Sequence, residues 1–233
     1  MTTRPVVAAL HTLGRGADRA RFQAPSGLPF VTITRQAWAG GLRLAEQLVQ
    51  RFNATDLDPT WECYDREIIE QVATDHDLPD EVIEQMLERP RSWLEDIASG
   101  LRYDQAHPTD EVVYAKVVAT IRALAERGHA VFIGRGAAYC TQDLATGVHI
   151  RLTAPLADRV ERAAAERGLS PARAERLVRQ TDDQRLAFIK RFWPSAQATD
   201  DLFALTLNTS RIPADAQACM VSMLVAARQA CIK

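Results

Sequence analysis

Short motifs rich in arginine, glycine and hydroxyl side chains follow four hydrophobic segments of this sequence. The segments are rich in β-branched and aromatic residues, which is typical of strands. The motifs are TRQAWAGG at residues 34–41, YDR at 64–66, GRG at 134–136 and NTS at 208–210. The carboxyl ends of parallel strands meet at one edge of a sheet, where glycine turns and helix N-termini bind phosphate groups. The sequence therefore predicts a phosphate site assembled from these four motifs.

Taken singly, each motif also has a simpler explanation. The glycine pair at 40–41 fits neither G-x-x-x-x-G-K-[ST] nor G-x-G-x-x-G, and such a pair before a helix is often structural. The GRG motif could be a tight exit from a strand with Arg135 on the surface. Asp65 could cap a helix, although a cap and a binding role can coexist. The order of the motifs along the chain is what favours a common site.

Alternating strand and helix patterns supply the scaffold for these motifs. Strands are expected at residues 28–34, 61–64, 130–134, 148–153 and 203–208. Helices are expected at 42–49, 155–167, 171–192 and 213–230. Gly168 is placed as a C-cap, and Ser170 before Pro171 has the pattern of a helix start. The alternation predicts an α/β domain whose parallel sheet is covered by helices on both faces.

Two segments lie outside this alternation. Residues 66–127 are helical in pattern, with expected helices at 66–69, 79–88, 91–100 and 109–127, and they form an inserted subdomain. Prolines at 90 and 108 separate the later pieces, because proline disfavours continuation of a helix. Residues 1–27 have no sustained apolar period, so we expect a flexible N-terminal arm.

Composition excludes several classes of protein. The chain has 233 residues, of which 47% are hydrophobic and 25% charged, which is ordinary for a folded domain and not for a disordered chain. Its 28 basic and 30 acidic residues give a net charge of −2, which disfavours a nucleic-acid or membrane partner. The apolar run at 5–10 is too short for a signal-peptide core or a membrane span, so a cytoplasmic protein is expected.

Arginine replaces lysine almost throughout the chain. Only Lys116, Lys190 and Lys233 are lysines, so a phosphate site in the N-terminal half must use arginine, backbone N–H groups or a helix N-terminus. The four cysteines, at 63, 140, 219 and 231, lack the spacing of zinc ligands. We expect them to be free thiols, in keeping with a reducing compartment.

In this order and spacing, the motifs resemble the cytidylate kinase-like family, a branch of the P-loop nucleoside monophosphate kinases. The similarity spans about residues 30–227. It rests on ITRQ at 33–36 with the glycine pair, YDREII at 64–69, IRALAERG at 121–128, VFIGRGA at 131–137, LTAPL at 152–156, TDDQR at 181–185 and LNTS at 207–210.

The resemblance implies a P-loop kinase-type fold with five parallel strands in a single domain, residues 28–233. It also implies a helical subdomain, 66–127, that binds an acceptor monophosphate, and a mobile lid, 170–200, that closes over a donor triphosphate, with ATP and Mg²⁺ as cofactors. The residues implied for the ATP phosphates are Arg35, Ala39, Gly40, Gly41, Leu42, Arg43, Arg179 and Lys190. Those implied at the transferring phosphoryl group are Arg135, Asp182 and Arg185, and those near the acceptor are Asp65 and Arg66. Any single lid arginine could instead belong to a solvated helix face.

The sequence also departs from the family pattern, which usually reads Gly-Ser-Gly-Gly-Arg at this turn. Trp38 replaces the first glycine, Ala39 the serine, and Leu42 the arginine. Arg43 follows one residue later, displaced by about 100° on a helix. We expect Arg43 to supply the missing charge and Arg35 to anchor the turn. Ala138 stands where related sequences often carry an aspartate.

Two functions remain open from the sequence. The first is ATP-dependent phosphoryl transfer to a nucleoside monophosphate such as CMP, or to another small acceptor. The alternative is a catalytically degenerate kinase-like protein that binds a nucleotide or a protein partner without transfer, because polar groups expected at the turn are missing. The sequence identifies neither the acceptor nor the oligomeric state.

Overall fold

Five strands form one sheet in the order β2-β3-β1-β4-β5 in the computed structural model, which describes residues 27–54, 60–65, 110–193 and 200–232. The strands are β1 (Phe30–Arg35), β2 (Glu62–Tyr64), β3 (Ala130–Ile133), β4 (Gly147–Thr153) and β5 (Leu205–Asn208). All four strand pairings are parallel. The expected five-stranded parallel sheet is therefore confirmed.

Strand β1 lies at the centre of the sheet. It pairs with β3 in the register Val31 to Val131 and with β4 in the register Ile33 to Ile150. Successive side chains of a strand point to opposite faces, and those of β1 are buried on both. Val31 and Ile33 enter one hydrophobic core and Phe30 enters the other.

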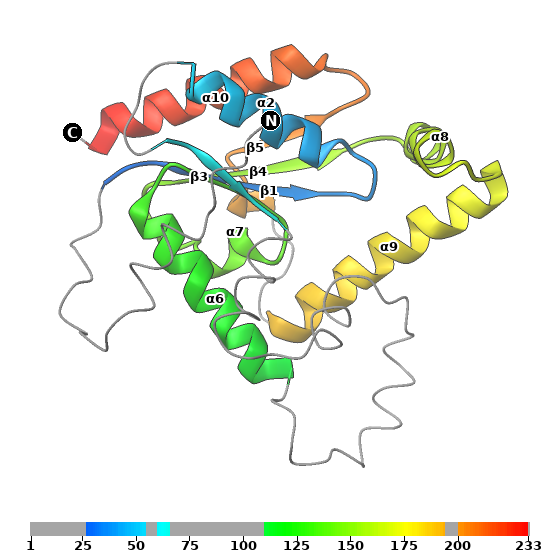
Figure 1. Ribbon diagram of the computed structural model, residues 1–233, viewed down its shortest axis with the longest axis horizontal. Coiled ribbons are helices and arrows are strands. Elements are labelled where there is room, and N and C mark those ends of the chain that lie inside the picture. Colours follow the sequence, from blue (N-terminus) through cyan, green and yellow to red (C-terminus); the bar gives the residue numbers. More distant parts are fainter. Residues whose placement is uncertain (1–26, 55–59, 66–109, 194–199, 233) are drawn as a thin grey trace.

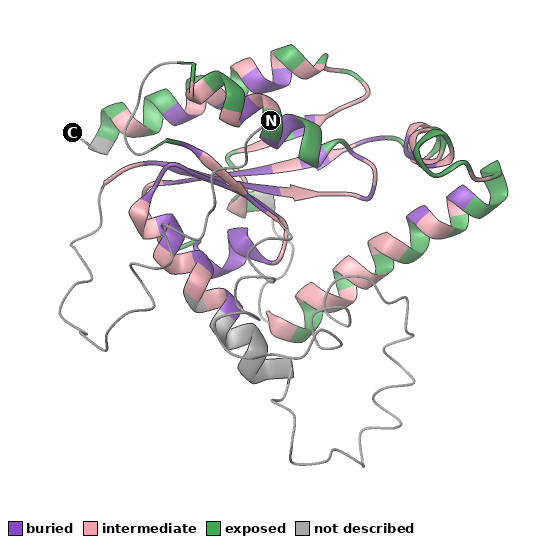
Figure 2. Ribbon diagram, viewed as in Figure 1, coloured by how far each residue is buried: buried purple, intermediate pink, exposed green. Residues whose placement is uncertain are grey.

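Helices cover both faces of the sheet (Figure 1). On one face lie α2 (Gly41–Phe52) and α10 (Ala214–Ile232), and on the other lie α6 (Asp110–Arg127) and α7 (Ala137–Cys140). Figure 2 shows the buried residues concentrated along the strands and on the inward sides of these helices. Burial on both faces explains why the strands contain near-continuous apolar runs.

Helices α8 (Leu156–Arg167) and α9 (Pro171–Phe192) lie beyond the carboxyl ends of the strands (Figure 1). Gly168 ends α8 with a φ of 62°, and Ser170 precedes α9 with Pro171 in its first turn, so both expected helix boundaries are confirmed. Ala163 of α8 and Ala174 and Val178 of α9 are buried in a third, smaller core with Ala37. This core joins the two helices to the loop that follows β1.

Two elements differ from the sequence-based expectation. Strand β5 begins at Leu205, not at Phe203, whose ring instead lies 5.8 Å from the Arg151 guanidinium. A short 3₁₀ helix, Asp200–Leu202, precedes it. Helix α7 was not expected, because four residues are too few to show a helical period. Its side chains are all buried, so it fills the space between the GRG motif and α6.

Parts of three expected segments lie outside the described residues: 1–26 of the arm, 66–109 of the helical subdomain and 194–199 of the lid. Of the expected helices, those at 66–69, 79–88 and 91–100 therefore have no counterpart to compare, whereas the one expected at 109–127 corresponds to α6. Within the described part of the chain, every helix is too short or too polar to cross a membrane.

Candidate phosphate-binding site

The loop between β1 and α2, residues 36–40, is called the phosphate loop below. It ends at Gly40, whose φ of 82° places it in the left-handed region directly before α2. The N–H groups of Gly41, Leu42 and Arg43 are in the first turn of α2 and have no partner within the helix. No acidic side chain lies in that turn. The start of α2 therefore presents N–H groups and the positive end of the helix dipole to an anion.

Trp38 has a left-handed backbone, with a φ of 55°. This conformation is unfavourable for a bulky residue and costs on the order of 1–3 kcal/mol. The strain is offset by packing, because the Trp38 side chain lies against the small core of α8 and α9. From the sequence, Trp38 was expected only to replace a glycine of the family pattern. The structure corrects this view, because Trp38 retains a backbone conformation that glycine adopts readily.

Two residues of the hairpin formed by α8 and α9 bind Ala37 in the phosphate loop. The Ala37 N–H donates to Asp182 Oδ1 at 2.7 Å, and its carbonyl accepts from Arg159 Nη1 at 3.4 Å. Arg159 Nη1 also lies 2.5 Å from Asp182 Oδ2. Because Arg159 is buried, with 7% of its side chain exposed, this ion pair fixes both helices against the loop.

Arg35 lies beneath the start of α2, between two glycines. A Cβ atom at Gly41 would lie 3.2 Å from Arg35 Cδ, and one at Gly134 would overlap Arg35 Nη1. The Arg35 side chain is 18% exposed, and its Nη2 lies 3.8 Å from Asp65 Oδ1. The Arg35 guanidinium therefore fills the space between two strand ends, and its role as the anchor of the turn stays a prediction.

Two further arginines approach Arg35. Arg185 of α9 donates from Nη1 to the Arg35 carbonyl oxygen at 3.1 Å. Burial and, to a smaller extent, the positive charge of Arg185 together lower the pKa of Arg35 to about 10, against the opposing effect of Asp65. Burial likewise lowers the pKa of Arg185 and outweighs the opposing negative charges of Asp182 and Asp65, while the positive charges of Arg135 and Arg159 make smaller contributions in the same direction as burial. Arg185 thus feels the positive charges of both Arg35 and Arg135 in a half-buried site, and an anion placed beside it would relieve that repulsion.

Arg135 reaches this cluster from a tight turn. Its φ is 53°, between Gly134 at 72° and Gly136 at 73°, so all three residues are left-handed. The GRG motif therefore forms a tight turn at the end of β3, which is one of the two interpretations of its sequence given above. Arg135 is nevertheless half-buried, and it lies close enough to Arg185 to affect the pKa of that residue. Arg35, Arg135 and Arg185, with Asp65 beside them, are called the arginine cluster below.

A cavity of about 430 Å³ lies on the other side of the phosphate loop. Ala39 and Gly40 of the loop and Arg43 of α2 line it on one side, and residues 209–213 between β5 and α10, with Ala214 at the start of α10, line it on the other. Arg162 of α8 lines it too and donates to the Trp38 carbonyl at 3.2 Å. The two hydroxyl groups of the NTS motif each accept from Arg162 at 3.1 Å. Arg43 therefore faces the cavity and not the arginine cluster.

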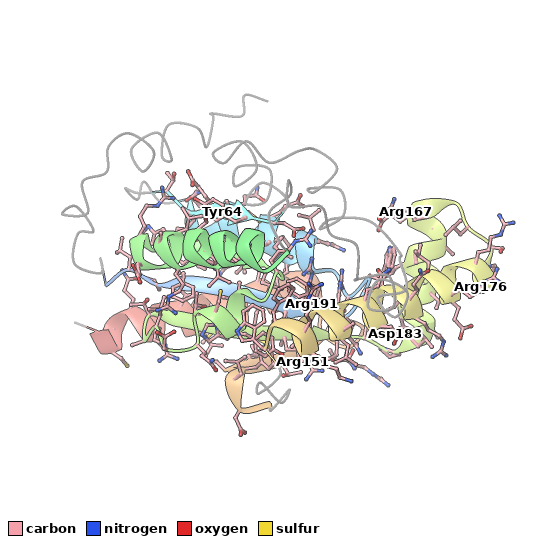
Figure 3. All side chains as sticks on the ribbon, turned by 90° about the horizontal axis from the view of Figure 1, so that it is seen from below. Tyr64, Arg151, Arg167, Arg176, Asp183 and Arg191 are labelled. Atoms are coloured by element: carbon pink, nitrogen blue, oxygen red, sulfur yellow. The ribbon has the colours of Figure 1, made fainter. Side chains whose placement is uncertain are left out.

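Several predicted site residues lie away from both regions. Arg179 pairs with Glu175 at 2.8 Å on an exposed face of α9, and Lys190 is exposed further along the helix. Leu42 is 57% exposed. Arg66 lies outside the described residues. Figure 3 shows Arg176, like Arg167, at the far end of α8 and α9 from the sheet. Of the lid residues, the structure brings Asp182 and Arg185 to the strand ends and leaves Arg179 and Lys190 outside.

The described residues do not fit a Mg²⁺ site made of protein ligands. Ala39 and Leu42 carry no side-chain oxygen at the turn. The two carboxylates at the strand ends, Asp65 and Asp182, are already paired with Arg35 and Arg159. Mg²⁺ prefers free carboxylate and phosphate oxygens. We therefore assign no step of the chemistry to a metal held by these side chains.

Arg159 and Arg162 were not found from the sequence. Both belong to α8, and both contact the phosphate loop through backbone carbonyls. Their spacing of three residues on a helix that follows a strand end was a usable signal, since i and i+3 side chains share a face. In an arginine-rich helix that signal does not stand out against the other arginines.

Known proteins resemble this chain in sequence pattern and in fold. The model of the cytidylate kinase-like family matches residues 30–211. A crystal structure of an uncharacterised protein from Eubacterium ventriosum has a TM-score of 0.61 at 14% identity, over 84% of this chain and 98% of that one, a likeness that concerns the fold alone. Shikimate kinase from Acinetobacter baumannii in complex with shikimate has a TM-score of 0.45 at 13% identity, over 86% of this chain and 94% of that one. A search of the curated proteins gave no match. Since the family model covers well over half of the sequence, the chain belongs to the cytidylate kinase-like family.

Proposed function

We propose that the protein transfers a phosphoryl group from ATP to a nucleoside monophosphate such as CMP, or to another small acceptor that carries a phosphate group. The observation that carries this proposal is the arginine cluster, in which Arg35, Arg135 and Arg185 gather in a half-buried site at the carboxyl ends of the strands. Phosphoryl transfer depends mainly on positioning and on neutralising charge on phosphate oxygens. Arginine forks are well suited to both tasks.

The donor nucleotide would occupy the cavity beside the phosphate loop. There Arg43, Arg162 and the Ser210 hydroxyl offer hydrogen-bond donors to its polar groups, whereas the Thr209 hydroxyl donates to the Thr153 carbonyl. Its phosphates would extend to the N–H groups in the first turn of α2, which are free of partners within the helix. The γ-phosphate would then lie toward the arginine cluster.

The acceptor would approach the cluster from the side of Asp65. Its nucleophilic oxygen forms a bond to the γ-phosphorus, while the bond from that phosphorus to the bridging oxygen breaks and ADP leaves. Arg135 and Arg185 would neutralise the equatorial oxygens as negative charge shifts between the two partners. Arg35, held by Asp65 and the two glycines, would support the site from beneath.

Calorimetry with ATP and with CMP, each titrated alone in the presence of Mg²⁺, tests this proposal. We expect a separate binding event for each ligand in the wild type. Arg135→Ala should weaken ATP or CMP binding by about 100-fold, which corresponds to about 3 kcal/mol. Arg176→Ala is the matched control, because it removes an exposed arginine far from the sheet. Equal affinities for wild type, Arg135→Ala and Arg176→Ala would overturn the proposal.

A degenerate, nucleotide-binding protein is the second candidate. It is favoured by the described acidic residues at the strand ends, which are paired with arginines, and by the exposed Leu42 where the family carries an arginine. A coupled assay for ADP release with a panel of monophosphates separates the two functions. ATP binding without turnover on any acceptor supports the second candidate.

A further inference from the structure

Ala37 and Trp38 are the residues of the phosphate loop that pack against α8 and α9, and Trp38 has by far the larger side chain. It packs beside the buried side chains Ala163, Ala174 and Val178, which come from both helices. Its own carbonyl accepts from Arg162 of α8. The loop is therefore held to the hairpin at Trp38 by apolar packing as well as by a hydrogen bond.

The same hairpin carries the side chains that act on the loop and on the arginine cluster. Asp182 binds the N–H of Ala37, which is the neighbour of Trp38. Arg185, three residues later on α9, binds the carbonyl of Arg35. A shift of α9 relative to the loop would lengthen both bonds at once. The position of Arg185 thus depends on how firmly α9 is docked.

We infer that Trp38 is a positioning residue that sets the distance between the phosphate loop and Arg185 by docking the loop on α8 and α9. The inference rests on the proposed function for its consequence in ligand binding, but the docking itself is independent of any ligand. A glycine at position 38 would keep the left-handed backbone and remove the packing. In this chain the hairpin is therefore fixed to the loop by a side chain that a glycine lacks.

Three variants separate this role from a general effect on stability. Trp38→Gly removes the ring while keeping a permitted backbone. Trp38→Phe retains an apolar ring of similar thickness. Val225→Ala is the matched control, because Val225 is buried in the core under α10, on the far side of the sheet from α9. The control lowers stability without touching the loop or the hairpin.

The first measurement is amide hydrogen exchange without ligand, over residues 156–180. Local opening of the hairpin raises exchange there before the whole domain unfolds. We expect exchange at least about 10-fold faster in Trp38→Gly than in the wild type, after correction for the global free energy of unfolding. Trp38→Phe and Val225→Ala should stay near the wild type. Wild-type exchange in Trp38→Gly would overturn the inference.

The second measurement is the affinity for ATP with Mg²⁺ by calorimetry. We expect about 10-fold weaker binding in Trp38→Gly, recovery to within about threefold in Trp38→Phe, and no change in Val225→Ala. Faster exchange with unchanged ATP affinity would overturn the positioning role. If the wild type fails to bind ATP, the proposed function fails, and the exchange result alone decides whether Trp38 docks the hairpin.

A milder variant covers the case in which Trp38→Gly does not fold. Val178→Ala removes two methyl groups from the same small core, on the α9 side. It should raise exchange over residues 156–180 and weaken ATP binding in the same direction, by about threefold each. Wild-type values for both quantities in Val178→Ala would contradict the inference.

Discussion

The carboxylate of Asp182 on α9 accepts a hydrogen bond from the backbone N–H of Ala37 in the phosphate loop, at 2.7 Å. Its other oxygen lies 2.5 Å from the buried Arg159. The negatively charged Asp182 of α9 therefore binds a backbone N–H of the loop, and Arg159 of α8 supplies the positive charge that balances it. The three segments are joined by a single carboxylate.

The first prediction concerns this carboxylate. Asp182→Asn keeps an oxygen for the Ala37 N–H but leaves Arg159 without its counter-charge. Removing one partner of a largely buried pair is costly, and we expect a loss of about 2 kcal/mol in the free energy of unfolding, less than for a fully buried pair because 28% of Asp182 is exposed. Urea unfolding measures the loss. Asp183→Asn, on the neighbouring exposed residue, should change stability by less than about 0.5 kcal/mol.

The second prediction concerns the charge at the start of α2. Arg43 faces the cavity, so Arg43→Ala should weaken ATP binding by about 10-fold. Leu42→Arg restores the arginine of the family pattern in the same helical turn and should strengthen ATP binding or raise turnover. Titration calorimetry and the coupled assay provide both readouts. Indifference to both substitutions would show that this turn does not contact the phosphates.

The third prediction concerns pH. Burial, and secondarily the charge of Arg228, lower the pKa of His149 to about 4. The unfolded chain takes up a proton on this histidine below about pH 6.5, whereas the folded chain does so only near pH 4. The free energy of unfolding therefore falls as the pH drops through this window, by about 2 kcal/mol between pH 7 and pH 4.5 from this group alone.

His149→Gln isolates that contribution. Glutamine is neutral at every pH in the window and can still form a hydrogen bond in place of the 2.8 Å contact between His149 Nδ1 and Thr32 Oγ1. Urea unfolding at pH 7 and pH 4.5 should show a smaller decrease for the variant than for the wild type. Parallel decreases in the two proteins would mean that another group titrates.

The fourth prediction concerns removal of metal. The described strand ends supply arginines and backbone N–H groups, but their carboxylates are already paired. ATP binding should therefore weaken by less than about 10-fold when EDTA replaces Mg²⁺, as measured by calorimetry. A loss of 100-fold or more would show that the metal and not the arginines provides most of the attraction.

The fold was predictable because the chain alternates regularly between β-branched runs and helical patterns. The run around Val131 is apolar on both faces, and those around Val31 and Ile150 place β-branched and aliphatic residues at alternate positions, as expected for strands of a covered sheet. The boundary of β5 was less certain, because Phe203 has a high strand propensity and nothing in its neighbours shows that it turns toward Arg151. A local sequence pattern predicts the existence of a strand or helix more reliably than it predicts the residue at which that element begins.

The site was predictable only in part, because it depends on how α9 is docked. The sequence placed Arg179 and Arg185 on the same helix and had no means of telling which faces the sheet. Docking by Asp182 turns Arg185 inward, whereas Arg179 pairs with Glu175 in solvent. Trp38 was misjudged for a related reason. Its side chain packs against residues more than 100 positions away in the sequence, and a local sequence pattern cannot predict such contacts.

The close approach of Arg35 to Gly134 limits how this protein can change over evolutionary time. Gly134 has a φ of 72°, and any side chain there would collide with the guanidinium of Arg35. A residue with a Cβ at position 134 would therefore force the end of the Arg35 side chain to move, which disturbs its pairing with Asp65, and would also strain the left-handed backbone at 134. The two positions should therefore vary together among related sequences.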